Sequence, residues 1–192
     1  QARMATAAEG TNIDGAIVNG GGLRASIPAG AVTQGAVQGV LPYRNQVCAV
    51  TMTGQTLLEI MEAATAAAPY PAGAFPQVSG IEMTVRTDIP FAKGRAYGNG
   101  KYYKPVKPGQ RVTIHRVGGK DFSPDAVYTI ATYEFVSRGG DAYGALAEAG
   151  RAETKYVGYT DAEAVVHYIQ DELQGRIGTE YAAPQGRIQL QP

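Results

Sequence analysis

The sequence predicts an α+β fold: one domain over residues 1–192, with a mixed β-sheet and flanking helices. Segments with strand character outnumber helical ones, and a hairpin signal sits among them, which disfavours a regular alternation of strand and helix. A length of 192 residues suits a single domain with a sizeable core. Neither an internal repeat nor a linker-like stretch divides the chain.

A strand is expected to start at Tyr43, after Pro42, and four further segments are expected to be strands. They are the short apolar run Gly15–Val18, which opens into three glycines; residues 81–85, where apolar and polar side chains alternate; residues 112–117; and residues 127–132. Between Tyr97 and Tyr102, the tripeptide Gly98-Asn99-Gly100 predicts a hairpin turn, because Asn-Gly readily adopts the φ angles of tight turns.

Two segments are expected to be helices. The first runs from Thr53 to Ala68, where apolar side chains share one face, and Pro69 stops it. The second begins at the capping box 160–163, in which the Thr160 hydroxyl and the Glu163 carboxylate each satisfy a backbone N–H group. Its apolar face extends over residues 162–173, and Gly175 ends it.

Charge and composition limit the classes of ligand. Lys and Arg number 17, and so do Asp and Glu, so the net charge is zero. A protein that holds a nucleic-acid polymer is normally basic, whereas a small nucleotide needs only a few cations. No apolar run is long enough to span a membrane. Cys48, the only cysteine, lies in an apolar run and is expected to be a buried, inert thiol.

The start of the chain, Gln1-Ala2-Arg3-Met4, has neither the apolar segment nor the cleavage motif of a signal peptide. We therefore expect the chain to be part of a longer protein.

The first candidate binding segment is Asn19-Gly20-Gly21-Gly22-Leu23-Arg24. Glycines after a buried strand let the backbone approach a ligand closely, and their amides can form an anion-binding nest. The Arg24 guanidinium can add a forked donor for phosphate. The spacing matches neither GxGxxG nor the Walker motif. The alternative, which the local sequence alone favours, is a tight turn at the strand exit with a solvated Arg24.

The second candidate segment is Gly139-Gly140-Asp141, with Phe135 four residues before it. The carboxylate of Asp141 can accept hydrogen bonds from the vicinal hydroxyls of a ribose. If Phe135 and Tyr43 face one cleft, a base between them gains about 1–3 kcal/mol per stacking ring. The alternatives are a loop with an Asx-type turn and two aromatic rings that belong to the core.

Metal-binding and hydrolytic residues are not indicated. His115 and His167 lie about fifty residues apart, without carboxylates at metal-ligand spacing, and both are expected to be structural. We therefore assign no catalytic residue and no metal ligand to this chain.

Several motifs in order resemble the C-terminal, substrate-binding domain of the 5′-nucleotidase / UDP-sugar hydrolase family. They are Asn19–Arg24, Leu41-Pro42-Tyr43-Arg44-Asn45, Thr51–Gln55, Phe75–Gly80, and residues 128–143, and the resemblance extends over about residues 12–190. Each motif alone is weak, but their order makes the combination specific.

The resemblance implies roles for individual residues. Tyr43 and Phe135 match the two aromatics that sandwich the base, and Asp141, after Gly140, matches the carboxylate that binds the ribose hydroxyls. Asn19 and Asn45 match polar contacts to the base or loop, and Arg24 matches a phosphate-binding arginine beside the loop Gly20, Gly21, Gly22. The family usually has Phe where this chain has Tyr43, a change that bears on base preference.

The resemblance also implies a larger enzyme in the periplasm or outside the cell. An N-terminal metallophosphoesterase domain would hold two divalent ions of the zinc or manganese type, and further phosphate-binding arginines would precede Gln1. The chain alone is then expected to be inactive. Activity as a 2′,3′-cyclic phosphodiesterase/3′-nucleotidase or as a UDP-sugar hydrolase, and a non-catalytic nucleoside-binding or surface module, stay open. Retention of both aromatics and Asp141 disfavours the thiosulfate-oxidation branch.

Overall fold

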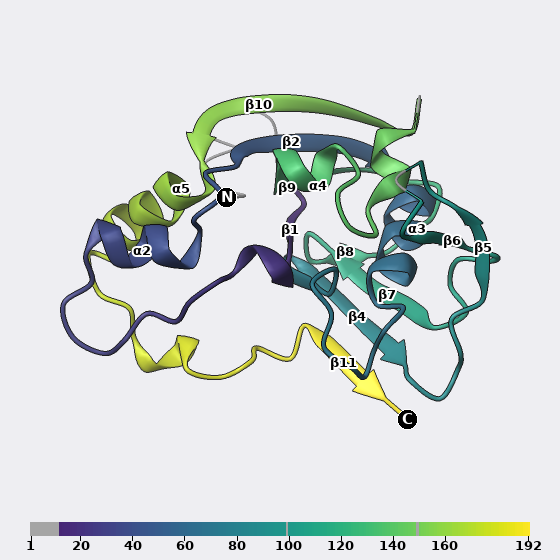
Figure 1. Ribbon diagram of the computed structural model, residues 1–192, viewed down its shortest axis with the longest axis horizontal. Coiled ribbons are helices and arrows are strands. Elements are labelled where there is room, and N and C mark those ends of the chain that lie inside the picture. The colour runs from purple at the N-terminus through teal and green to yellow at the C-terminus, as the bar shows by residue number, and fades with distance from the viewer. Residues whose placement is uncertain (1–11, 99, 149) are drawn as a thin grey trace.

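Two β-sheets and a hairpin make up the framework in the computed structural model, which describes residues 12–98, 100–148 and 150–192 (Figure 1). The larger sheet has the order β10-β2-β9-β1-β3, and the second has the order β11-β4-β7-β8. Pairing is parallel between β1 and β9 and between β11 and β4, and antiparallel elsewhere. The mixed sheets and flanking helices confirm the α+β fold class.

The strands expected from local sequence are all present. They are β1 (Gly15–Asn19), β4 (Ile81–Arg86), β7 (Val112–Val117) and β9 (Val127–Tyr133). The expected hairpin is formed by β5 (Lys93–Ala96) and β6 (Tyr103–Pro105), closed by a 2.8 Å hydrogen bond from the Tyr97 amide to the Tyr102 carbonyl. Asn99, at the tip of the predicted turn, lies outside the described residues.

Helix α3 (Gly54–Ala64) begins as predicted but ends four residues early. Thr53 caps its start, with its side chain accepting from the Thr56 amide. The guanidinium of Arg111 donates to the carbonyls of Thr65 and Ala68. Because this buried side chain takes up the carbonyl groups at the helix end, the chain can turn there instead of extending the helix to Ala68.

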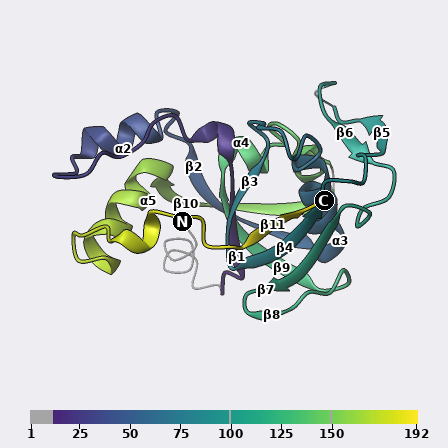
Figure 2. The same ribbon diagram turned by 90° about the horizontal axis from the view of Figure 1, so that it is seen from below.

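The capping box at Thr160 and Glu163 is confirmed and begins helix α5 (Asp161–His167). The helix continues as a single π-helical segment, η3 (Tyr168–Glu172). At its start, α5 packs on α2 (Gln34–Val40), and the two helices lie together at one end of the molecule (Figure 1 and Figure 2).

The strand expected from Tyr43 is β2 (Gln46–Thr53), which begins three residues later. The remaining strands have no clear local signal; they are β3 (Pro76–Ser79), β8 (Lys120–Asp121), β10 (Ala152–Thr160) and β11 (Ile188–Gln191). Short 3₁₀ turns, η1 (Gly20–Gly22), η2 (Gly144–Ala147) and η4 (Thr179–Tyr181), and a helical turn, α4 (Glu134–Ser137), complete the chain.

Helix α3 forms the centre of the main core. It contacts β2 of the larger sheet and β7 of the second sheet. Leu57, Ile60 and Met61 on this helix are fully buried against side chains of both sheets. The β5–β6 hairpin lies at the α3 end of the molecule, far from α2 and α5 (Figure 1 and Figure 2). The core therefore fixes the strand ends from which the candidate site is built.

Candidate functional site

The candidate site lies where β1 and β9 end. These two strands run parallel, so their carboxyl ends meet at the same edge of the sheet. Asn19 is the last residue of β1, and Tyr133 is the last residue of β9. Helix α4 follows β9 directly and leads into the Gly139–Asp141 loop. The topology therefore brings Asn19, Phe135 and Asp141 together although they are far apart in the sequence.

A chain of hydrogen bonds fixes the Asp141 carboxylate. The Asn19 amide donates from Nδ2 to Oδ2 of Asp141 over 2.6 Å, and the hydroxyl of Tyr133 donates to Oδ1 of Asn19. On the other side, the hydroxyl of Tyr102 donates to Oδ1 of Asp141 over 3.1 Å. Asn19 and Tyr133 are buried, so one side of the carboxylate is anchored in the core.

Two glycines are required by close packing in this site. A Cβ atom on Gly22 would lie 2.2 Å from the Tyr133 hydroxyl, and one on Gly140 would lie 2.6 Å from ring carbons of Phe135. The Gly140 amide also donates to the Phe135 carbonyl. Any side chain at Gly140 would therefore displace the ring of Phe135 from the loop that carries Asp141.

A pocket of about 830 Å³ opens beside Asp141. It is lined by Asn45, Lys101, Tyr102, Glu134, Phe135, Arg138, Gly139, Gly140 and Asp141. The structure thus gathers four predicted residues: Asn45, Phe135, Gly140 and Asp141. Phe135 is 42% exposed and Tyr43 is 60% exposed, so neither ring belongs to the core. Tyr43 is not among the lining residues, although it lies two positions from Asn45.

The glycine loop differs from the expected anion-binding nest. The Gly20 amide donates to the Phe75 carbonyl and the Gly21 amide donates to the Gly73 carbonyl, each over 2.8 Å. The expectation of free amides is therefore wrong for these two groups, because the loop uses them to pair with the neighbouring 73–75 segment. Arg24 is exposed, lies 3.4 Å from the Gly21 carbonyl through Nη1, and does not line the pocket.

Asn45 connects the pocket to helix α5. Its Nδ2 donates to Oδ2 of Asp161 over 3.2 Å, and the Asp161 amide donates to the Asn45 carbonyl. Burial raises the pKa of Asp161, and the hydrogen bond from Asn45 partly opposes that rise. Asn45 therefore has a structural partner as well as a place in the pocket wall.

Four lining residues escaped the sequence interpretation: Lys101, Tyr102, Glu134 and Arg138. Arg138 forms a 2.7 Å ion pair with Glu134. Burial, followed by the charge of Asp141, raises the pKa of Tyr102, so its phenol stays protonated and can donate at neutral pH. Only their positions in the sequence could have indicated these residues: Tyr102 follows the predicted hairpin turn, and Glu134 and Arg138 flank Phe135.

Metal-ligating side chains do not converge within the described residues: no group of three His, Cys, Asp or Glu is placed to hold an ion. His115 pairs with the Thr84 hydroxyl through Nε2 over 2.8 Å, and Nδ1 of His167 lies 3.2 Å from Asp171. No helix in the described part of the chain has the length and apolar character needed to cross a bilayer.

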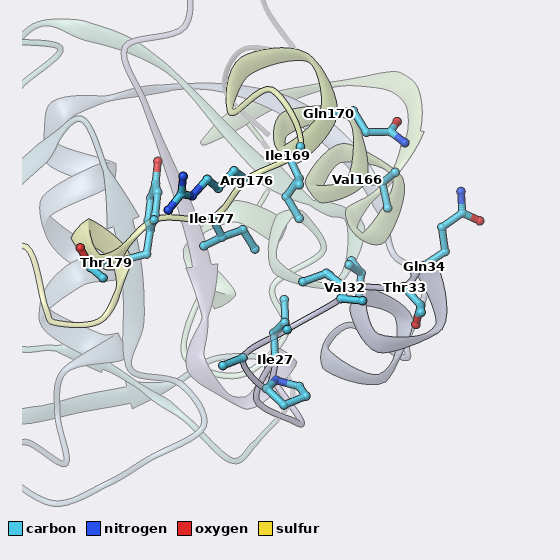
Figure 3. A pocket seen from close by; sticks show the side chains of 18 of the residues that line it. Ile27, Val32, Thr33, Gln34, Val166, Ile169, Gln170, Arg176, Ile177 and Thr179 are labelled. Atoms are coloured by element: carbon cyan, nitrogen blue, oxygen red, sulfur yellow. The ribbon is translucent and has the colours of Figure 1, made fainter.

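A second pocket, of about 970 Å³, lies between the 27–37 segment and residues 166–182 (Figure 3). Its wall is largely aliphatic, with Ile27, Val32, Val166 and Ile169, and Arg176 is its one charged lining residue among those described. None of the predicted site residues reaches it. The smaller pocket, which combines an aromatic ring with a fixed carboxylate, is therefore the better candidate site.

The family model for the "5′-nucleotidase, C-terminal domain" matches residues 2–148, and the chain belongs to this family. It is 33% identical over 186 residues to the trifunctional nucleotide phosphoesterase protein YfkN of Bacillus subtilis, covering 91% of this chain and 11% of that protein. It is also 33% identical over 176 residues to a 5′-nucleotidase of Vibrio cholerae, covering 91% of this chain and 27% of that protein.

The solved structures give the same result. The chain superposes on the 5′-nucleotidase precursor of Thermus thermophilus with a TM-score of 0.74 and 28% identity, covering all of this chain and 34% of that one. The V. cholerae and T. thermophilus relatives are 5′-nucleotidases by name, and the family model describes the C-terminal domain of such proteins. It spans 11% of the B. subtilis relative and 27% of the V. cholerae relative.

Proposed function

We propose that this chain is the substrate-binding domain of a metal-dependent nucleotidase that hydrolyses nucleoside phosphates. The observation that carries the proposal is the Asp141 carboxylate, held by Asn19 and Tyr102 beside the exposed ring of Phe135. An oriented carboxylate next to an open aromatic face suits a ligand that is a diol on one side and a flat ring on the other.

In this proposal the base stacks on Phe135, and Tyr43 covers it from the other side. Both rings are exposed, which stacking on a ligand requires. Because Tyr43 stands outside the pocket wall, the sandwich forms only when Tyr43 moves towards the base. Asp141, beside the Phe135 ring, then receives the ribose hydroxyls.

Phosphate is proposed to lie near Arg24, outside the pocket. The guanidinium is exposed and bound only weakly, at 3.4 Å, to its own loop. Because the amides of Gly20 and Gly21 already donate to backbone carbonyls, Arg24 is the main group through which the loop would bind phosphate. A forked guanidinium is well suited to phosphate oxygens.

The two divalent ions of the proposed enzyme do not fit the residues of this chain, because no three candidate ligands converge in its described part. We propose that an N-terminal metallophosphoesterase domain of the same protein holds them and that this chain alone hydrolyses nothing. A protein of this kind would act in the periplasm or outside the cell. The length of the relatives leaves room for such a domain.

The likeness to the trifunctional phosphoesterase of B. subtilis supports a second candidate. In that case the same pocket would serve nucleotides that carry the phosphate at another position, including 2′,3′-cyclic nucleotides. The base contact would be unchanged, whereas Asp141 would lose the donors whose oxygens the phosphate esterifies.

The test separates the phosphate end of the ligand from the ribose end. In full-length protein treated with EDTA, AMP and adenosine are titrated against Arg24→Ala and Asp141→Asn; Asn is chosen because Asp141 has a φ of 49°. Arg24→Ala should weaken AMP far more than adenosine, and Asp141→Asn should weaken both alike. Equal losses for both ligands in Arg24→Ala would remove Arg24 from the phosphate role, and absence of any nucleoside binding would refute the proposed function.

A further inference from the structure

The β5–β6 hairpin places Tyr102 in the wall of the pocket. The Tyr102 carbonyl accepts from the Tyr97 amide, which closes the turn, and its hydroxyl reaches Oδ1 of Asp141. Lys101 and Tyr102 are the lining residues that come from this hairpin. The hairpin therefore forms part of the pocket wall, although it belongs to neither of the two main sheets.

Charged groups hold the hairpin in place at its base. The Tyr97 hydroxyl donates to Glu59 of α3 over 3.0 Å. Glu148 pairs with Lys104 of β6 over 2.9 Å and with Arg95 of β5 over 2.7 Å. Tyr97 is buried, and its ring packs on the backbone of Gly144, where a Cβ would lie 2.3 Å away. Tyr102 is thus presented by an anchored element rather than by a free loop.

The two sides of the Asp141 carboxylate are unequal. Oδ2 is bonded to the buried Asn19, which does not line the pocket, whereas Oδ1 is bonded to Tyr102, which does. A ligand that enters the pocket therefore reaches Asp141 on the side of Tyr102. There it meets two oxygens, Oδ1 of Asp141 and Oη of Tyr102, 3.1 Å apart.

We propose that Tyr102 is a specificity-determining residue that, together with Asp141, recognises the cis-diol of a ribonucleoside. The inference rests on the proposed function and deepens it by adding Tyr102 as a second group at the ribose hydroxyls, which makes ribose preferred over deoxyribose. The Tyr102 hydroxyl donates its single proton to Asp141, and its oxygen can also accept a hydrogen bond from a hydroxyl of the sugar. One sugar hydroxyl donates to the carboxylate and its neighbour donates to the phenol.

Loss of the phenol hydroxyl should then reduce discrimination between sugars, not binding in general. A site built to bond two hydroxyls penalises an analogue that lacks one of them, because its polar group is left without that partner. In Tyr102→Phe the acceptor for one hydroxyl is gone. The deoxynucleoside that lacks this hydroxyl should therefore bind Tyr102→Phe as well as it binds the unmodified protein.

The experiment measures binding of adenosine, 2′-deoxyadenosine and 3′-deoxyadenosine to the full-length protein; nucleosides carry no phosphate and are not hydrolysed. Tyr102→Phe should weaken adenosine about two- to tenfold and leave one of the deoxynucleosides within twofold. Tyr103→Phe is the matched control: it removes the same hydroxyl from the next residue, whose ring lies under Lys93. It should leave all three affinities unchanged.

Four outcomes would overturn the inference. Equal weakening of all three ligands in Tyr102→Phe would mean that Tyr102 only supports the pocket wall. The same loss of discrimination in Tyr103→Phe would assign the effect to the hairpin as a whole. If adenosine binds the unmodified protein and Tyr102→Phe changes nothing, the inference alone fails; if no nucleoside binds at all, the proposed function fails with it.

Discussion

Asn19 and Asp141, 122 positions apart in the chain, are joined by a 2.6 Å hydrogen bond from the amide nitrogen to the carboxylate. The same amide accepts the hydroxyl of Tyr133 through its oxygen. These partners distinguish the two atoms of the Asn19 amide: the oxygen faces a phenol that donates, and the nitrogen faces a carboxylate that accepts. Asn19 therefore orients the candidate ribose-binding group and need not touch the ligand.

Asn19→Ala should destabilise the fold by about 1–3 kcal/mol, because it removes the side-chain partner of the buried Tyr133 hydroxyl and of one carboxylate oxygen of Asp141. Urea unfolding measures the loss. Tyr133→Phe supplies the control: the two substitutions should cost less together than the sum of their separate effects, since they remove the same bond. Fully additive losses would show that the Tyr133–Asn19 bond contributes nothing to stability.

Phe135→Ala should weaken adenosine binding by about 1–3 kcal/mol, because it removes the stacking surface. Tyr43→Ala should have an effect of similar size. Both side chains are exposed, so the unfolding midpoint should change little. Tyr181→Ala, which alters the wall of the other pocket, is the control and should leave binding unchanged. Wild-type affinity in Phe135→Ala would exclude base stacking at this ring.

Arg111→Ala should destabilise the protein by about 3–5 kcal/mol. The side chain is 2% exposed and donates to the carbonyls of Ile89, Thr65 and Ala68, all of which would lose a charged donor. Arg116→Ala on β7, the strand that begins at the residue after Arg111, is the matched control, because that side chain is exposed, and it should cost less than about 1 kcal/mol. Similar midpoints for the two variants in urea would contradict this role.

Cys48 should resist thiol reagents at pH 8 in the folded protein and react once the protein is unfolded. Burial raises the pKa of its thiol from 9.0 to about 11, so the reactive thiolate is scarce. The buried neutral thiol also favours folding fully below pH 9, and this contribution is lost as the pH rises towards 11. Cys48→Ala should lack that part of the pH dependence. Rapid modification of the folded protein at pH 8 would contradict the assignment.

Local sequence determined the elements whose signals are short-range. The capping box at Thr160, the apolar face of the helix expected from Thr53 and the alternation in residues 81–85 each depend on neighbours a few positions away, and each element begins where expected. Strand β2 was expected only as a strand that begins near Tyr43, and its extent was not predicted, because a central strand covered on both faces is continuously apolar and lacks the alternation that marks a strand. The segment is a strand because it pairs with β9 and β10, which lie far from it in the sequence.

The ordered motifs identified the family, and with it Phe135 and Asp141, from sequence alone. Only the tertiary structure decided how those residues are held. The amides of Gly20 and Gly21 look available in the sequence, but they pair with a segment about fifty residues away. Tyr102 carries no motif, yet the hairpin brings its hydroxyl to Asp141. Hydrogen-bond partners that are distant in the chain are set by packing, and no local pattern encodes them.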